Sequence, residues 1–490
     1  MLTPPLNGRR KILTNADVIT SANIVQELNR VLPIHFLNRD EEEYLYWYRR
    51  GVQPILERRK SVRPEILNKV VENHCEEIVA FKNGYFLTQP AYYISRIDGD
   101  KANARVQKLN GYLRNSGKAE ADNKVADWFH TVGVGILYVE PNDSDAVPFK
   151  VYALDPRNSF VVYSSRPGNK PVYGVNMVQT SDDHIVFDVF TEDYVYRLDG
   201  GIKQDQHLEM PLSAMAIKLS DEPPMPNVIG RVPMVEYHCN LENMGSFESV
   251  ISLQNALNMV MSNRIDGIEQ FIQSLAIAVN CDFEEGTTAN DIREAGMIVL
   301  KSIGENKADF KILSEQLDQS ETQVLADHLY HRMMAICGVP SSKTVSGSTS
   351  DNSGAVLARD GWYQADNFAR NTTDLYKESN RYFDEMIVEI LRRKVNFSIG
   401  ADEFEIQLAH NEISNLLIKT QGALNLKQLG LSPEIVLTRS GISNDPIADV
   451  AASRKYIDIA YASNELQSTE NAPLDSKNWV NGYYRSNEGN

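Results

Sequence analysis

Cysteine is scarce in this sequence, and its spacing fits no metal or redox motif. Four cysteines are spread over 490 residues, and no Cys-x-x-Cys pair occurs. So few cysteines in so long a chain indicate a reducing compartment rather than a disulfide-stapled secreted domain. The sequence also begins without the apolar run of a signal peptide, so we expect a soluble product made in the cytoplasm.

Long hydrophobic runs are also missing. The most apolar window covers residues 271–279. A membrane-spanning helix needs roughly 20 apolar residues, so this window is far too short. We therefore expect no contact with a membrane.

Basic residues are in deficit, with 49 Lys and Arg against 66 Asp and Glu, for a formal charge of −17. This balance argues against a protein that grips nucleic acid over a broad basic surface, but not against one past which nucleic acid slides. The charge is uneven along the chain. Residues 1–120 carry 19 basic against 14 acidic residues, and residues 121–490 carry 30 against 52.

Signatures of catalysis and cofactor binding are missing as well. The region of Gly338 and Lys343 lacks the spacing of a phosphate-binding loop, and no Gly-x-Ser-x-Gly elbow occurs. Gly133 and Gly135 lie between a predicted helix and a strand, the reverse of a dinucleotide fingerprint, so we expect them to permit close packing. The sequence therefore gives no support for an enzyme or for a cofactor.

One metal site is conceivable from residue types alone. His328 and His331 share a helix face at i, i+3, and Cys337 follows in the same stretch. No carboxylate or further cysteine completes a known pattern. The alternative is a pair of ordinary surface histidines.

The first half of the chain has the patterns of an α+β domain. Residues 1–39 are expected to form a loosely tethered arm, and residues 40–60, 64–83 and 101–131 have the apolar spacing of helices. Short runs rich in β-branched and aromatic residues then alternate with turn residues, which predicts an antiparallel meander. The expected strands are Gly135–Glu140, Phe149–Leu154, Phe160–Tyr163, Val172–Val178, His184–Phe190 and Tyr194–Leu198.

Long helices dominate the second half, so we expect a mainly helical α+β fold. Residues 246–279 keep a three-four apolar rhythm, and a helix of that length would measure about 50 Å. An acidic insert at 280–317 separates it from a second helix at 318–337. A third helix, from residue 355 to 394, is followed by a strand, Phe404–Leu408, within 355–410. Residues 411–462 are again helical, and the polar tail 463–490 is expected to be disordered.

The stretch 338–354 between two of these helices consists mainly of serine, threonine and glycine, with one cation, Lys343. Such residues bury too little apolar surface to fix a loop, so we expect it to be mobile. A passive linker is one interpretation. The other is a functional loop on a rigid mount, whose hydroxyl groups and lysine contact phosphates.

The order of these parts resembles the portal proteins of tailed double-stranded DNA phages, of the siphophage type. The resemblance covers roughly residues 40–460. The matching segments are Arg-Val-Pro-Met-Val-Glu-Tyr, where the chain leaves the first domain, and several helix-forming and turn segments further along the chain. These segments are Arg231–Tyr237, Ser249–Ile268, His331–Pro340, Leu429–Leu437 and Asp445-Pro446.

The resemblance implies a portal fold with named parts. Residues 1–39 would precede a wing at 40–245, to which the strand in 355–410 returns after a tunnel helix. Two stem helices would flank a small α/β clip. The stem helices would lie at 246–279 and 318–337, and the clip at 280–317. The other parts would be a tunnel loop at 338–354, a crown at 411–462 and a tail at 463–490.

The resemblance also implies a function without catalysis. Such portals form a ring, of twelve subunits in the particle, at one capsid vertex of the virion after assembly in the host cytoplasm. The ring conducts double-stranded DNA during packaging and ejection. Its partners would be further copies of the chain, the terminase large subunit, the head-completion adaptor, and the capsid and scaffolding proteins.

Two sets of site residues follow from the resemblance. Acidic clip residues would dock the motor and the adaptor: Asp282, Glu284, Glu285, Asp291 and Glu294. Tunnel-loop residues would face DNA: Ser341, Ser342, Lys343, Thr344, Ser346, Ser348, Thr349, Ser350 and Asn352.

Two other functions remain as alternatives to a portal. One is a ring-forming scaffold that never contacts DNA, and the other is an enzyme of nucleic-acid metabolism.

Overall fold

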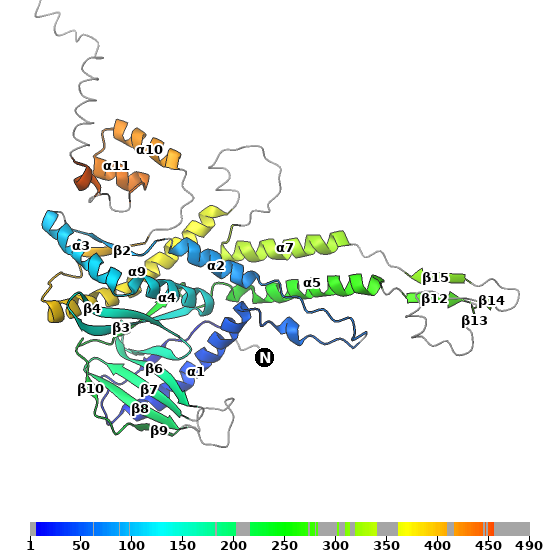
Figure 1. Cartoon of the computed structure of the whole chain (residues 1–490), viewed down its shortest axis with the longest axis horizontal. Coiled ribbons are helices and arrows are strands. Elements are labelled where there is room, and N and C mark those ends of the chain that lie inside the picture. Colours follow the sequence, from blue (N-terminus) through cyan, green and yellow to red (C-terminus); the bar gives the residue numbers. More distant parts are fainter. Residues whose placement is uncertain are drawn as a thin grey trace, which may run out of the picture. The chain divides into compact units, whose positions relative to one another are not determined.

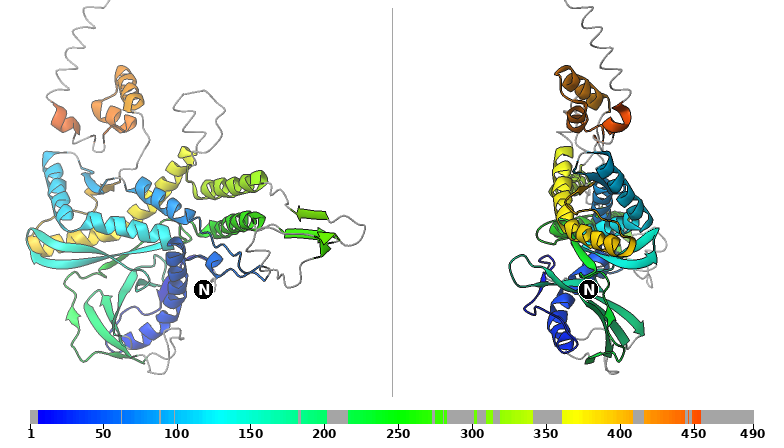
Figure 2. Two further views of the ribbon diagram at one scale, coloured as in Figure 1. Left: turned by 45° about the vertical axis from the view of Figure 1, so that its right-hand side comes forward. Right: turned by 90° about the vertical axis from the view of Figure 1, so that its left-hand side faces the viewer.

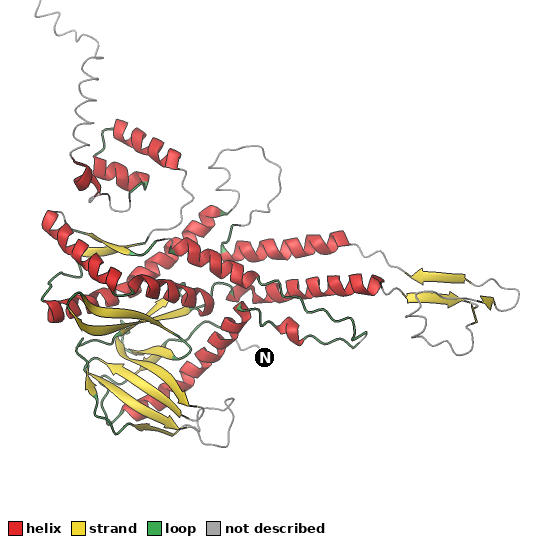
Figure 3. Ribbon diagram, viewed as in Figure 1, coloured by secondary structure: helices red, strands yellow, loops and turns green. Residues whose placement is uncertain are grey.

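The fold combines long helices with a seven-stranded sheet, a three-stranded sheet and shorter strand pairs (Figure 3). The computed structural model describes residues 6–61, 63–87, 89–97, 99–181, 184–201, 216–272, 275–279, 281–282, 301–302, 309–313, 319–340, 361–408, 416–443, 446 and 449–454. Contacts divide the chain into two compact units. The first comprises Met1–Phe86 and Leu113–Ser398, and the second comprises Leu87–Tyr112 and Ile399–Asn490. The expected wing range 40–245 is therefore divided between the two units.

A seven-stranded sheet forms one part of the first unit (Figure 1). Its centre is a consecutive antiparallel series, because short turns join neighbouring strands. β1 pairs with β5 in parallel, and β9 and β10 both pair with β8. The strands are β1 (Ile12–Thr14), β5 (Ser159–Ser164), β6 (Pro171–Ser181), β7 (His184–Thr191), β8 (Tyr194–Gly201), β9 (Ala216–Leu219) and β10 (Met225–Pro226).

A smaller sheet has the order β11-β3-β4. Its strands are β3 (Val134–Ser144), β4 (Val147–Leu154) and β11 (Met234–His238), and α4 (Lys118–Val132) packs on it. All six predicted strands are confirmed. The single predicted meander is wrong, because the chain changes sheets between β4 and β5. Asp199, Gly200 and Gly201 are residues typical of turns, but here they extend β8 and pair with β7.

The N-terminal arm is not loosely tethered. Residues 12–14 form β1, and α1 runs from Ile24 to Arg49, so the expected helix start at Asp40 is wrong. Pro33 lies inside α1, and the helix continues through it because Ile24, Leu28 and Leu32 are buried against the large sheet. Burial of this apolar face outweighs the lost backbone bond at the proline.

The helix predicted at 64–83 begins later. α2 covers His74–Phe86, and most of the preceding chain is irregular apart from η1 (Pro54–Glu57). Two predictions further along are confirmed in type: α3 (Asp100–Asn115) with α4, and α7 (Gln319–Cys337). The third long helix, α9, is described over Trp362–Val395.

The first long helix is shorter than predicted. After η3 (Glu248–Val250), α5 spans Ile251–Ile272, and residues Leu275–Val279 form strand β12. β12 pairs with β15 (Asp309–Leu313), which satisfies the backbone hydrogen bonds of this apolar run. Periodicity alone cannot show whether so short an apolar run is a strand or part of a helix. β15 covers the apolar run Phe310–Leu313 of the acidic insert. A second short pair joins β13 (Cys281–Asp282) to β14 (Lys301–Ser302).

The second unit is built on a two-stranded sheet. β16 (Phe404–Gln407) pairs with β2 (Tyr92–Ser95), as expected for a strand that returns to an early part of the chain. Asn110 of α3 exchanges two hydrogen bonds with the backbone of Tyr93, at 2.9 and 2.8 Å. The unit also holds α10 (Leu416–Gln428) and α11 (Pro433–Ser440), which confirms helical structure in the range 411–462.

Gly133 has the packing role expected of it. It caps α4 with a φ of 94°, a conformation that favours glycine. A β-carbon there would lie 2.1 Å from the carbonyl oxygen of Asn243. The Gly133 position therefore requires both a left-handed backbone and the absence of a side chain.

Gly133→Ala should lower the free energy of unfolding by about 3 kcal/mol or more, because strain and a backbone clash add. Gly168→Ala is the matched control: its φ is 91°, and no atom lies within 4 Å of the added carbon. The control should cost only about 1–2 kcal/mol. Urea unfolding at one protein concentration measures both, and equal losses would contradict the clash.

Candidate functional site

Helices α5 and α7 lie side by side and run in opposite directions (Figures 1 and 2). Leu257 on α5 and Met333 on α7 belong to one buried apolar cluster, which also includes Val79 on α2. Arg264 of α5 donates a hydrogen bond to Gln323 of α7. The pair is therefore joined along its length and rooted in the core of the first unit.

A buried polar stripe marks α5. Gln254, Asn258, Ser262 and Asp266 recur at every fourth position, and each is at most 3% exposed. Four residues separate neighbours on one helix face, so these side chains form a line along the axis. Buried polar groups require hydrogen-bond partners. Residues 66–73 supply several of the partners here.

Residues 66–73, which we call the strap, lie extended along this stripe. The backbone N–H of Asn68 donates to Asp266 Oδ1 at 2.8 Å, that of Val70 to Ser262 Oγ at 3.0 Å, and that of Glu72 to Asn258 Oδ1 at 3.0 Å. A four-residue helical step rises about 6 Å, and two extended residues span about 6.6 Å. The two repeats therefore match, which explains why the strap is not helical.

Charge strengthens the far end of the strap. Arg58 Nη2 lies 3.1 Å from Asp266 Oδ2, and Lys60 Nζ lies 3.4 Å from the same oxygen. Burial acts to raise the pKa of Asp266, but the two Asn68 hydrogen bonds and these cations outweigh it and lower that pKa. Asp266 therefore stays ionised and holds the strap at neutral pH.

The outer faces of α5 and α7 expose several large apolar side chains. Val324 is 68% exposed, which is unusual for a residue on a packed helix pair. Such a surface is typical of a contact between chains. The exposed residues on the two helices are Met259, Ile268, Val324, Leu325 and Ile336.

The end of α7 forms a fixed root for the polar loop. Cys337 and Val339 are buried in the same core as α2 and α5. Gly338 has a φ of 68°, and a β-carbon there would lie 2.3 Å from the ring of Phe368 on α9. The last residues before the loop are thus held by close packing between α7 and α9.

A second cation lies near this root. Lys82 Nζ is 4.8 Å from the centroid of the Phe368 ring, and Lys82 forms no ion pair with any residue that the structure describes. Burial lowers the pKa of Lys82. Sequence reasoning pointed to Lys343 alone, because no local pattern reveals that Lys82 of α2 packs beside α9.

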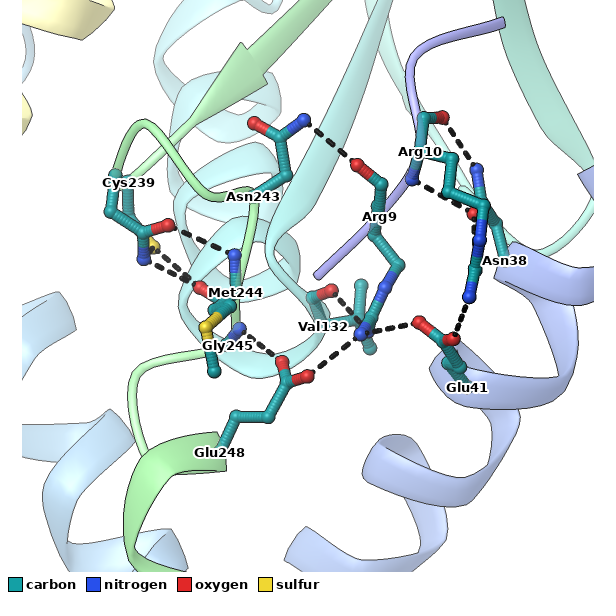
Figure 4. Close-up of polar contacts among 11 residues, drawn as sticks. Arg9, Arg10, Asn38, Glu41, Val132, Cys239, Asn243, Met244, Gly245 and Glu248 are labelled. Atoms are coloured by element: carbon teal, nitrogen blue, oxygen red, sulfur yellow. Dashed lines mark hydrogen bonds and ion pairs between the residues drawn. The ribbon is translucent and has the colours of Figure 1, made fainter. Parts of the chain in front are cut away.

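The N-terminal segment closes the junction between the sheets and α5 (Figure 4). Arg9 is buried, and its Nη2 lies 2.8 Å from both Glu41 Oε2 of α1 and Glu248 Oε1 of η3. Its Nη1 donates to the carbonyl oxygen of Val132, at the end of α4, at 3.0 Å. We call this set the Arg9 clasp.

Backbone contacts extend the clasp on both sides. Arg9 and Asn243 exchange two hydrogen bonds at 3.0 Å, and Asn38 accepts from the backbone N–H of Arg10 and donates to its carbonyl. Glu248 also accepts from the backbone N–H of Gly245 at 2.8 Å. One segment thus ties α1, α4 and the entry to α5 together.

Two titratable groups lie near the clasp on β11. Glu236 Oε1 is 3.2 Å from His238 Nε2. Burial raises the pKa of Glu236 to about 7, although Lys11 partly opposes this, and burial with Lys11 lowers the pKa of His238 to about 4. At neutral pH the histidine is therefore uncharged, and the carboxyl group is near its midpoint.

The conceivable metal site is not assembled. His328 is exposed, whereas Cys337 is buried in the core, so the structure does not bring them together. The part of the chain that the structure describes contains no group of three His, Cys, Asp or Glu residues suited to a metal ion. Among the same residues, no helix is long and apolar enough to cross a membrane.

Most of the residues predicted to dock the motor or to face DNA lie outside the residues that the structure describes. Asp282 belongs to β13. Every other predicted clip and loop residue lies outside the described residues: Glu284, Glu285, Asp291, Glu294, Ser341, Ser342, Lys343, Thr344, Ser346, Ser348, Thr349, Ser350 and Asn352. Their roles stay predictions, and the described structure gives only the elements that carry them.

Residues 29–458 match the model of one protein family, described as phage portal protein, SPP1 Gp6-like. The chain belongs to this family of phage portal proteins. Comparison with curated proteins gives no match. The resemblance to phage portals seen in the sequence is thereby confirmed.

The family gives this portal protein a structural role in the phage capsid, as an oligomeric ring for DNA packaging. The helix pair α5–α7, its polar stripe and the Arg9 clasp are therefore features of a portal subunit. Sequence reasoning noticed the apolar rhythm of α5 but missed the polar stripe. The signal was present, as polar residues at every fourth position of an otherwise apolar helix.

Ser262→Ala should destabilise the portal subunit by about 1–3 kcal/mol, because the N–H of Val70 loses its acceptor in a partly buried position. Ser252→Ala, at an exposed position of the same helix, is the control and should change stability by less than about 0.5 kcal/mol. The free energy of unfolding in urea measures both. A neutral Ser262→Ala would show that the strap is held by other contacts.

Glu236→Gln should stabilise the portal subunit increasingly as pH rises from 4.5 to above 7. The pKa of Glu236 is raised in the folded chain, so the folded state favours the protonated carboxyl group. The stability that this side chain contributes is therefore fully present below pH 4.5 and is lost as pH rises through about 7. The variant escapes this loss, by about 2–3 kcal/mol at pH 8. Unfolding free energies across this range, with exposed Glu65→Gln as the control, measure it. A difference independent of pH would refute the shift.

Proposed function

We propose that this portal protein forms a ring of twelve subunits at one capsid vertex, through which double-stranded DNA is packaged and later ejected. The helix pair α5–α7 is the stem of each subunit. The sheets with α1 and α4 belong to the wing, and α9 is the tunnel helix that runs into it. Residues 411–462 of the second unit form the crown. The family match carries the proposal, and the α5–α7 surface supports it.

The exposed apolar residues of the stem explain why subunits associate. Val324 and Leu325 lie on α7, and Met259 and Ile268 lie on α5. In a ring every subunit has a neighbour on each side, so two different surfaces of one chain become buried by head-to-tail contacts. The apolar stem surface would then be covered in the assembled portal.

The ends of the stem carry the working parts. Strands β13, β14 and β15 belong to the clip at 280–317. Its acidic residues, Asp282 and Glu284 among them, dock the terminase large subunit and later the adaptor. At the other end, residues 338–354 form the tunnel loop. Lys343 and the neighbouring hydroxyl groups contact passing DNA briefly, since a single cation adds little counterion-release affinity.

The acidic charge of the chain suits a conduit. With −17 per subunit, a ring would present a repulsive wall to a duplex. Dense lysine or arginine contacts would hold the DNA instead of letting it move. Conductance through the assembled ring should therefore favour cations.

Class-averaged electron micrographs of the purified chain test the proposed function directly. The expected result is a ring with a central hole. A uniform population of monomers or compact dimers at high protein concentration would overturn the proposal. ATP or DNA hydrolysis by the purified chain would favour the enzyme alternative instead.

Deletion of residues 341–354 should leave ring formation intact and reduce DNA packaging or retention in assembled heads. Lys343→Ala should act in the same direction with a smaller effect, because one of several loop contacts is lost. Micrographs of rings and DNA content per head measure the two steps separately. Unchanged packaging by the deletion would favour a passive linker and a ring without DNA contact.

A further inference from the structure

Aromatic and arginine side chains gather at a surface pocket between α1 and α4 in the first unit. The pocket measures about 450 Å³, and its lining includes Tyr46, Arg50 and Trp128. Trp47, 38% exposed, packs edge-on against Tyr46 with ring centroids 5.3 Å apart. The whole chain contains only four tryptophans, and two of them lie here. We call Tyr46, Trp47, Arg50, Trp128 and Arg157 the cation–aromatic patch.

Stacking holds this patch in place. The rings of Tyr46 and Trp128 are stacked, with centroids 5.5 Å apart. The guanidinium carbons of Arg157 and Arg50 lie 3.9 and 4.0 Å from the Tyr46 centroid. Groups already ordered by stacking lose little conformational entropy when a partner binds.

Arg50 differs from the other cations around the pocket. Arg49 pairs with Glu76 and Asp127, and Lys124 pairs with Glu120. Arg157, which lies over the Tyr46 ring outside the pocket lining, pairs with Asp155 and Glu43. Arg50 is exposed and forms no ion pair with any described residue of the chain. Its planar guanidinium therefore keeps a fork of N–H donors that matches the two oxygens of a carboxylate.

We propose that the cation–aromatic patch binds a carboxylate-bearing segment of a second copy of this chain, with Arg50 as the central contact. Tryptophan, tyrosine and arginine are the residues that dominate binding energy at protein interfaces. The acidic partner surface lies in the chain itself, because residues 121–490 carry 52 acidic against 30 basic residues. The inference rests on the proposed ring, in which one face of each copy meets a different face of the next.

Charge reversal at the patch tests the contact. Arg50→Glu should raise the protein concentration at which half of the chains are assembled by about tenfold or more, and Arg50→Lys should have a smaller effect because the fork is lost but the charge is kept. Lys170→Glu, the same charge change at an exposed position of the β5–β6 turn, is the control. Circular dichroism of the unassembled chains checks that the fold is kept.

Sedimentation velocity against protein concentration gives the result. The inference is supported if Arg50→Glu alone weakens assembly. It is overturned if Arg50→Glu assembles like the wild-type chain, or if Lys170→Glu weakens assembly equally.

Photocrosslinking identifies the occupant directly. A p-benzoylphenylalanine in place of Trp47, in the full chain, should crosslink two copies, and peptide mapping should place the partner peptide within residues 121–490. Crosslinks only within one chain, or only to DNA or another capsid protein in assembled heads, would overturn the inference. Crosslinked copies in a preparation without rings would contradict the proposed function but keep this contact.

Discussion

The pairing of the strap with α5 is the contact on which the α5–α7 helix pair depends. A helix that projects from a domain has few neighbours, so its own stability in water is marginal. Here the side chains of Asn258, Ser262 and Asp266 accept hydrogen bonds from alternate backbone amides of residues 66–73. The helix gains a packed neighbour, and the strap satisfies its backbone without a sheet.

The Arg9 clasp fixes the start of α5 to the rest of the first unit. One buried guanidinium is shared by Glu41 and Glu248, so α1 and the entry to α5 are fixed by one charged group. Removing Arg9 would leave the buried carboxylate of Glu248 without its cation, which makes the geometry specific. The α5–α7 pair, its end at Gly338 and the two sheets therefore form a single connected frame within the first unit.

How far the sequence predicts this structure depends on the range of the interactions. Strands β3–β8 and helix α7 follow from local periodicity, because their alternation or three-four rhythm reflects one buried face. Pro33 inside α1, the extended strap and strand β12 were not predictable in that way. Each depends on a partner distant in sequence: the large sheet, the side chains of α5, and β15.

For the functional site too, some features could be inferred from the sequence and others appear only in the folded chain. The family resemblance identified a portal subunit, and the α5–α7 pair is the element that we propose as its stem. Lys82 beside Phe368, the Arg9 clasp and the exposed Arg50 emerge only when distant segments are brought together. The predicted tunnel-loop and clip contacts stay predictions, since their residues lie outside the described ranges.

Hydrogen–deuterium exchange at single-residue resolution tests the strap most directly. The account predicts an alternating pattern, with slow exchange at the amides of Asn68, Val70 and Glu72 and fast exchange at those of Lys69 and Val71. Only the first three amides donate to side chains of α5. Uniformly fast exchange across residues 66–73 would show that the strap does not brace the stem in solution.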